Sequence, residues 1–188
     1  MNNILTSIKM LALFTIITGI IYPLAMTGIA AVAFNAKSNG SIISVNGSTV
    51  GSVHIGQEFA LPKYFHGRPS ASTYDPLASG GSNYGPAHED LIKRASASAA
   101  QFRKENSLTN DTLIPSEMVL ASGSGLDPHI TLPAALLQSE RVAHERHINK
   151  DVIVKRINEL AEYKYFDLFG EKIVNVLLLN IALDRSEK

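Results

Sequence analysis

The amino-terminal part of the chain contains a long run without charged side chains, and this run restricts the fold more than any other feature. Residues 10–36 read MLALFTIITGIIYPLAMTGIAAVAFNA, whereas charges of both signs recur throughout the chain beyond Glu58. The hydrocarbon core of a bilayer is about 30 Å thick and is crossed by about 20 apolar residues in a helix. We therefore predict that residues 1–36 form a membrane anchor whose transmembrane helix covers residues 10–34.

The same run also contains a possible cleavage site, which raises the alternative of a secretory signal. Ala31, Val32 and Ala33 form an A-x-A pattern. The apolar region of a secretory signal usually has about 7 to 15 residues, and the run here is much longer. Its length favours a retained anchor over the alternative, a secreted binding module released after Ala33.

Two features of the anchor concern its neighbours and its orientation. Pro23 lies near the middle of the span, where it removes a backbone donor and can kink the helix. Membrane helices tolerate such a proline when neighbouring helices satisfy the freed carbonyl, which points to partner helices. Lys9 precedes the span and only Lys37 follows it closely, so the positive-inside rule narrowly favours a cytoplasmic amino terminus and an outward soluble part.

The composition excludes one class of partner and one source of stability. The 188 residues include 17 basic and 17 acidic side chains, and there is no cysteine. A protein that binds nucleic acid usually has a basic face, so we expect no nucleic-acid partner. Disulfides contribute nothing to the stability of the outward domain.

Beyond the anchor, the pattern predicts a linker and one small domain. Residues 37–52 are rich in glycine, serine and asparagine, which is typical of a linker or of two short strands around turns. The soluble domain covers residues 53–188, with a strand expected at residues 50–59. Residues 61–91 are rich in proline and glycine, yet their aromatic side chains argue for order. Because long loops of this kind are usually functional or disordered, we expect residues 61–91 to form an ordered surface that another molecule contacts.

Three helices and a final mixed element complete the expected fold. Residues 86–106 repeat apolar side chains at helical spacing, with Pro86 in the first turn. Thr131 is expected to cap a second helix and Asp151 a third. The apolar run at residues 173–183 fits a buried strand that turns helical at its end. The predicted fold class is α+β: one N-terminal transmembrane helix followed by a single small mixed α/β soluble domain.

The segment ASGSGLDPHI, residues 121–130, contains the residue types of a catalytic triad in Ser124, Asp127 and His129. A nucleophile elbow, G-x-S-x-G, needs a glycine two residues before the serine, where this chain has Ser122. The better interpretation is a rigid turn whose two glycines permit unusual backbone angles and whose Asp-Pro pair leads into the next helix. A membrane-tethered serine hydrolase that uses Ser124 and His129 remains an alternative.

Two other segments resemble known sites without satisfying their geometry. His144 and His147 lie three residues apart, whereas the zinc motif H-E-x-x-H needs histidines four apart, and residue 148 is isoleucine. Residues 79–82, SGGS, lack the lysine and the spacing of a phosphate-binding loop. We therefore expect neither a catalytic residue nor a metal ligand in this chain.

Five sequence blocks follow the anchor in a fixed order: GRPSAS at residues 67–72, SGGSNYGP at 79–86, ASGSGLDPHI at 121–130, QSERVA at 138–143 and VNVLLLNIALD at 174–184. With these blocks the chain resembles the C subunit of the bacterial Kdp potassium-transporting ATPase over nearly its whole length. The resemblance implies a non-catalytic accessory subunit, needed for assembly, with a single span in the cell inner membrane. With the cytoplasmic amino terminus that the positive-inside rule favours, the soluble domain is expected on the periplasmic side. The implied partners are a potassium-channel-like A subunit, a P-type ATPase B subunit that hydrolyses ATP, and a small F peptide. Together they take up potassium at high affinity.

The resemblance also implies candidate functional residues. The C subunit of this family is described as a catalytic chaperone that raises the ATP affinity of the B subunit, and the matching nucleotide-binding residues here are Gln138, Ser139 and Arg141. We expect no tightly bound cofactor, with ATP reaching the chain only through the complex. The expected partner interface consists of Gly67, Arg68, Pro69, Ser70, Ser79, Gly80, Gly81, Ser82, Asn83, Ser122, Gly123, Ser124, Gly125 and Asp127.

The predicted orientation and the nucleotide role conflict with each other. If the soluble domain lies outside the cytoplasm, Gln138 lies where ATP for the B subunit is not found. The outward orientation favours a structural or entrance-side role in the complex.

Overall fold

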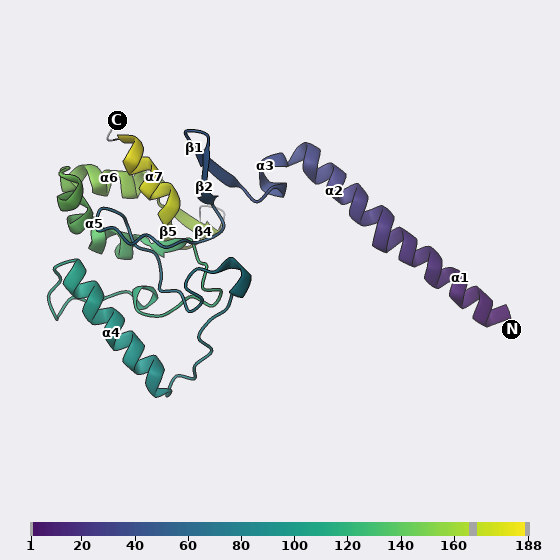
Figure 1. Ribbon diagram of the computed structural model, residues 1–188, viewed down its shortest axis with the longest axis horizontal. Coiled ribbons are helices and arrows are strands. Elements are labelled where there is room, and N and C mark those ends of the chain that lie inside the picture. Colours follow the sequence, from purple (N-terminus) through teal and green to yellow (C-terminus); the bar gives the residue numbers. More distant parts are fainter. Residues whose placement is uncertain (1, 166–168, 187–188) are drawn as a thin grey trace. The chain divides into compact units, whose positions relative to one another are not determined.

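The computed structural model describes residues 2–165 and 169–186, and the chain divides into two compact units, Met1–Ile42 and Ile43–Lys188. The first unit is a long helix made of α1 (Asn2–Ile16), the π-helical turn η1 (Ile17–Ile21) and α2 (Tyr22–Ala33) (Figure 1). Its stretch Asn3–Ala33 is long and apolar enough to cross a membrane, and none of it is buried. The predicted long apolar helix is confirmed, and it begins nearer the amino terminus than residue 10.

The helix accommodates Pro23 through a change of hydrogen-bond pattern. The Tyr22 N–H donates to the Ile17 carbonyl, five residues back, and Pro23 then occupies the first turn of α2. Proline suits that position because no N–H is needed there. A π-helical turn of this kind is an established cause of a local bend in a helix.

The glycine-rich stretch that follows forms two short strands. After the single turn of α3 (Asn35–Ser38), β1 (Ile42–Val45) and β2 (Ser48–Ser52) pair in a two-stranded sheet. Asn46 and Gly47 connect them with φ angles of 53° and 80°. Two successive positive φ angles are the pattern of a type I′ turn, for which Asn-Gly is the preferred sequence.

The prediction of a strand at residues 50–59 is wrong beyond Ser52, where β2 ends. From there the backbone forms single hydrogen bonds to separate partners instead of a ladder. The Asn175 side chain donates to the Val53 carbonyl at 2.8 Å, and the Gly56 N–H donates to the Leu126 carbonyl at 2.8 Å. Residues 53–88 then run without helix or strand apart from the 3₁₀ turn η2 (Pro76–Ala78), as the proline content predicts.

The second unit is built on an antiparallel sheet in the order β3-β5-β4. Its strands are β3 (His129–Thr131), β4 (Glu162–Tyr165) and β5 (Phe169–Asn175), and three helices pack on it: α5 (Leu132–Arg146), α6 (Lys150–Leu160) and α7 (Val176–Ser186) (Figure 1). The last apolar run is therefore a strand that continues directly into a helix, as predicted. The core between these elements includes Phe65, Phe102, Ile130, Val142, Ile153, Ile157, Val174, Leu179 and Leu183.

The predicted helix starts need two corrections. The helix α4 (Glu89–Glu105) begins three residues after Pro86, because His88 is extended and its ring nitrogen accepts a hydrogen bond from the Asp90 N–H at 3.2 Å. Asn149, and not Asp151, caps α6, since its side-chain oxygen accepts from the Asp151 N–H at 2.8 Å. The expected cap of α5 is confirmed, because the Thr131 hydroxyl accepts from Ala134 N–H.

Candidate functional site

Three glycine- and serine-rich segments that lie far apart in the sequence meet in the folded domain. The Ser124 carbonyl accepts hydrogen bonds from the Gly80 N–H at 2.8 Å and from the Ser79 hydroxyl at 3.0 Å. The Ser122 N–H donates to the Pro69 carbonyl at 3.3 Å. The structure thus brings together the three segments that contain the predicted interface residues. These segments, residues 67–72, 79–83 and 121–127, are called here the loop cluster.

The segments of the loop cluster approach so closely that glycine is required at one position. Gly125 has a φ of 70°, and a Cβ there would lie 2.5 Å from the Ser72 hydroxyl and 2.9 Å from the Gly80 carbonyl. At Gly123 φ lies outside the left-handed region and a Cβ would contact nothing within 4 Å. The expected unusual backbone angle is therefore confirmed at Gly125 and wrong at Gly123.

An ion pair joins two segments of the loop cluster. Arg68 donates to the Asp127 carboxylate at 3.0 Å, and both side chains are about one-third exposed or less. Burial alone would raise the pKa of Asp127, but hydrogen bonds from His129 and the nearby Arg68 guanidinium outweigh burial and lower this pKa to about 2. The carboxylate is charged at neutral pH, and it ties the first block to the third.

The chain that leads into the loop cluster is held by side-chain amides instead of by a neighbouring strand. Asn180 of α7 pairs twice with Phe65, accepting from its N–H at 2.9 Å and donating to its carbonyl at 3.0 Å. Gln138 of α5 pairs in the same way with His66, at 2.8 and 3.1 Å. Because Phe65 and both amide side chains are buried, these bonds replace water for backbone groups that would otherwise be unsatisfied.

Two arginines of α5 also hold the backbone of this chain segment. Arg141 donates to the Pro62 and Tyr64 carbonyls, to Asn106 and to the Gln138 side-chain oxygen. Arg146, five residues further along α5, donates to the Lys63 carbonyl at 2.8 Å and to Asp184 at 2.9 Å. Burial lowers the pKa of the Arg141 guanidinium from its usual range. We use the term side-chain clamp for Gln138, Arg141, Arg146 and Asn180.

The predicted nucleotide-binding residues all lie inside the domain. Gln138 is 0% exposed, Ser139 is 1% exposed and Arg141 is 9% exposed. The Ser139 hydroxyl donates to the Leu136 carbonyl at 2.6 Å, and the other two belong to the side-chain clamp. Their polar atoms serve internal hydrogen bonds in this state, and the nucleotide role stays a prediction.

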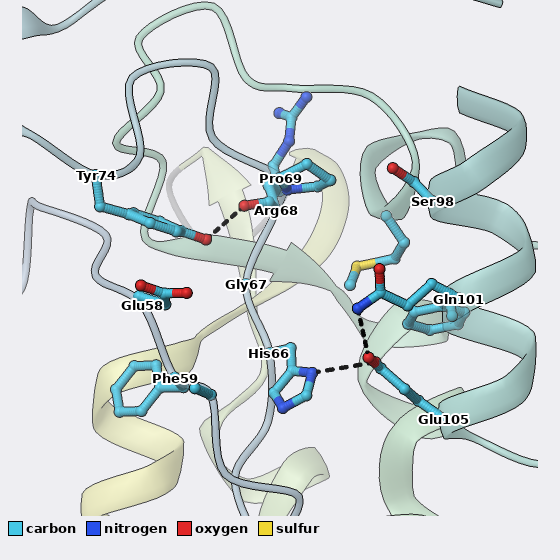
Figure 2. A pocket seen from close by; sticks show the side chains of 13 residues that line it. Glu58, Phe59, His66, Gly67, Arg68, Pro69, Tyr74, Ser98, Gln101 and Glu105 are labelled. Atoms are coloured by element: carbon cyan, nitrogen blue, oxygen red, sulfur yellow. Dashed lines mark hydrogen bonds and ion pairs between the residues drawn. The ribbon is translucent and has the colours of Figure 1, made fainter. Parts of the chain in front are cut away.

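A polar pocket of about 370 Å³ lies beside the loop cluster, between the chain at residues 58–69 and α4 (Figure 2). His66 lies 3.5 Å from the Glu105 carboxylate, which also accepts from Gln101 at 2.7 Å. Burial, and then the nearby Arg141, lower the pKa of the His66 ring below its ordinary value. Glu58 reaches into the pocket from the other side, as Figure 2 shows. With His66 neutral, the pocket can accept a hydrogen-bonding or positively charged group.

The structure does not assemble the triad of the hydrolase alternative. The His129 ring nitrogen Nδ1 lies 3.7 Å from the Asp127 carboxylate, and the His129 backbone N–H donates to the same carboxylate at 3.0 Å. The Ser124 hydroxyl instead accepts from the Leu126 N–H at 3.1 Å. Within residues 2–165 and 169–186, no hydrogen bond joins Ser124 to His129. Acid and base are adjacent, but the nucleophile is not activated by them.

The histidines at the end of α5 serve the helix end and the surface. His147 adopts a left-handed conformation with φ of 56° and ends α5, while the His144 side chain is 81% exposed beside Glu145. Among the residues whose placement is described, no group of three or more histidine, cysteine, aspartate or glutamate side chains is arranged to hold a metal ion.

Sequence reasoning missed Asn180 and Arg146, which hold the chain ahead of the loop cluster. Asn180 had a visible signal, because it interrupts the apolar run VLLLNIAL. A polar side chain at a core position of a helix is usually hydrogen-bonded, so an internal hydrogen bond of Asn180 was foreseeable. Its partner, the backbone of Phe65, was not.

Comparison with known proteins places these features in a family. The family model described as "KdpC: K+-transporting ATPase, c chain" matches residues 4–185. A protein named potassium-transporting ATPase KdpC subunit from Mycobacterium tuberculosis is 45% identical over 186 residues, which is 98% of each chain. Proteins of the same name from Caldanaerobacter subterraneus and Gloeobacter violaceus are each 42% identical, over 97% and 98% of this chain and 94% and 96% of theirs.

Proposed function

Since the chain belongs to the KdpC family of potassium-transporting ATPase subunits, we propose that its soluble unit is a non-catalytic docking module and that the loop cluster is its contact surface. The transmembrane helix anchors this module beside the other subunits. The pump takes up potassium at high affinity, with ATP hydrolysis on the B subunit and with the A subunit and F peptide as the other partners. The subunit supports assembly of this complex.

The observation that carries the proposal is the loop cluster itself. Three separate segments are joined by backbone hydrogen bonds, by one ion pair and by a glycine that admits close contact. Parts of this surface remain exposed, including Gly123 and Ser124. A preformed surface loses little conformational entropy on binding, which suits a docking role.

The proposed orientation places the amino terminus in the cytoplasm and the soluble unit on the periplasmic side of the cell inner membrane. The internal hydrogen bonds of Gln138 support a structural role for this residue. Raising the ATP affinity of the B subunit, as the family resemblance implies, would require Gln138 to leave those partners. We therefore assign the chain a structural role in the assembled pump.

A bulky substitution at Gly123 tests the proposal without disturbing the domain. Gly123→Tyr introduces its side chain at an exposed position where a Cβ meets no atom within 4 Å. We expect it to reduce co-purification with the other subunits from gently solubilised membranes several-fold, while the thermal unfolding of the chain is unchanged. Lys155→Tyr, on the exposed face of α6, is the matched control and should co-purify normally. Normal co-purification of Gly123→Tyr would contradict the assignment of the loop cluster.

A further inference from the structure

The middle of the transmembrane helix has more backbone acceptors than backbone donors. The Tyr22 N–H donates to Ile17, and the Ile21 carbonyl, as the cap of α2, accepts the first bond of that helix. Between these two carbonyls lie those of residues 18–20. Pro23 has no N–H, so only the Leu24 N–H is left for these three carbonyls. At least two of the three therefore lack a backbone donor of their own.

Nearby side chains do not supply the missing hydrogen bonds. The Thr18 hydroxyl donates to the Phe14 carbonyl at 2.6 Å, and the Thr27 hydroxyl donates to the Pro23 carbonyl at 2.8 Å. Gly19 has no side chain, and a Cβ there would meet nothing within 4 Å. In the described part of the first unit, no side chain donates to the carbonyls of residues 18–20.

The position of these carbonyls makes an external donor necessary. Thr18 lies at the midpoint of the Asn3–Ala33 span, equally far from both ends. Water is absent from the centre of a bilayer, and an unsatisfied carbonyl there is costly, so freed backbone groups are normally satisfied by neighbouring helices. The missing side chain of Gly19 lets another helix approach this backbone closely.

We propose that a transmembrane helix of another subunit lies against the Gly19–Pro23 face and donates a side-chain N–H or O–H to the carbonyls of residues 18–20. The contact specifies both a location, the middle of the membrane, and a chemistry, a hydrogen-bond donor on an otherwise apolar helix. This inference rests on the proposed assembly of the chain with other subunits, but it can fail while the assembly itself holds.

Photo-crosslinking in the assembled complex locates the contact. Tyr22 and Phe14 are both exposed aromatic residues of the span, and Tyr22 lies two residues after the carbonyl of residue 20. With p-benzoylphenylalanine at Tyr22, we expect an adduct with a different subunit, and at least several-fold less of that adduct with the same probe at Phe14. Adducts of the Tyr22 probe with lipid only, with a second copy of this chain, or in equal amounts from both positions would overturn the inference.

A second variant tests the role of the carbonyls. Pro23→Ala restores an N–H at position 23, so that a regular α-helix can pair every carbonyl and leave the external donor without an acceptor. We expect retention of the chain in the purified complex to fall by about threefold to thirtyfold, the range for one interhelical hydrogen bond in a membrane. Thr27→Val removes only a hydrogen bond within the helix and should be retained like the wild type.

The outcomes separate the two proposals. If the wild-type chain does not co-purify with the other subunits, the proposed function fails. If the wild-type chain co-purifies and Pro23→Ala is retained equally well, only the inference about the membrane contact fails.

Discussion

Replacing Gln138 by methionine tests whether this residue holds the fold or waits for a ligand. Methionine has nearly the length and shape of glutamine but cannot replace its amide. The substitution leaves the N–H and the carbonyl of His66 without their partners, and it removes one acceptor from Arg141. Gln138 is 0% exposed, so water does not take its place.

The expected loss of stability follows from these three groups. A buried polar group without a partner costs about 1–3 kcal/mol, and the lower half of this range applies because His66 is only partly buried. The more apolar side chain returns about 1 kcal/mol through burial. The three groups together cost about 3–6 kcal/mol, so the net loss is about 2–5 kcal/mol, which lowers the melting temperature of a domain of this size by about 5–20 °C.

Thermal unfolding of the detergent-solubilised chain, followed by circular dichroism, measures this loss. Gln101→Met is the matched control, because Gln101 is exposed on α4 and its side-chain amide donates a hydrogen bond to Glu105 at 2.7 Å. Such a surface change should alter stability by at most about 0.5 kcal/mol. Equal melting temperatures for the two variants would refute the reasoning. Equal melting temperatures with a weakened ATP dependence of the pump would instead assign Gln138 to the nucleotide.

Three further expectations concern the loop cluster. The pKa of Asp127 is lowered from 3.8 to about 2, so the stability that its carboxylate contributes is complete above its ordinary pKa and is lost as the pH falls toward 2. In Asp127→Asn, the free energy of unfolding should therefore depend less steeply on pH in this window. An unchanged pH dependence would contradict the ion pair. Gly125→Ala places a Cβ 2.5 Å from the Ser72 hydroxyl at a positive φ and should cost about 1–3 kcal/mol in denaturant unfolding, whereas Gly123→Ala should be nearly neutral; equal effects would contradict the close approach. A fluorophosphonate probe should leave the folded chain unlabelled, and labelling at Ser124 would restore the hydrolase alternative.

Local patterns predicted most elements of the fold. The anchor and helices α4, α5 and α6 follow from apolar periodicity and composition, and β5 with α7 follows from the last apolar run. The strands β3 and β4 were missed because three and four residues carry too little periodicity, and each exists only through pairing with β5. The first turn of α4 was misplaced because His88, which caps it, is not a usual capping residue.

The candidate site was predictable in its parts and not in its assembly. The blocks that form the loop cluster stood out by their glycine and serine content, and the failure of the elbow pattern at Ser122 correctly argued against a triad. The pairing of Gln138 with His66 and of Asn180 with Phe65 joins residues 72 and 115 positions apart. Neither periodicity nor composition specifies which backbone a buried amide will meet.

The side of the membrane on which the soluble unit lies is the central claim, and one cysteine tests it. The chain has no cysteine of its own, so Ser107→Cys, at an exposed position after α4, carries the only thiol. A membrane-impermeant thiol reagent should label this residue in intact cells, to the same extent as after lysis. Labelling only after lysis would place the soluble unit in the cytoplasm, contradict the structural assignment and make the nucleotide role the better account of Gln138.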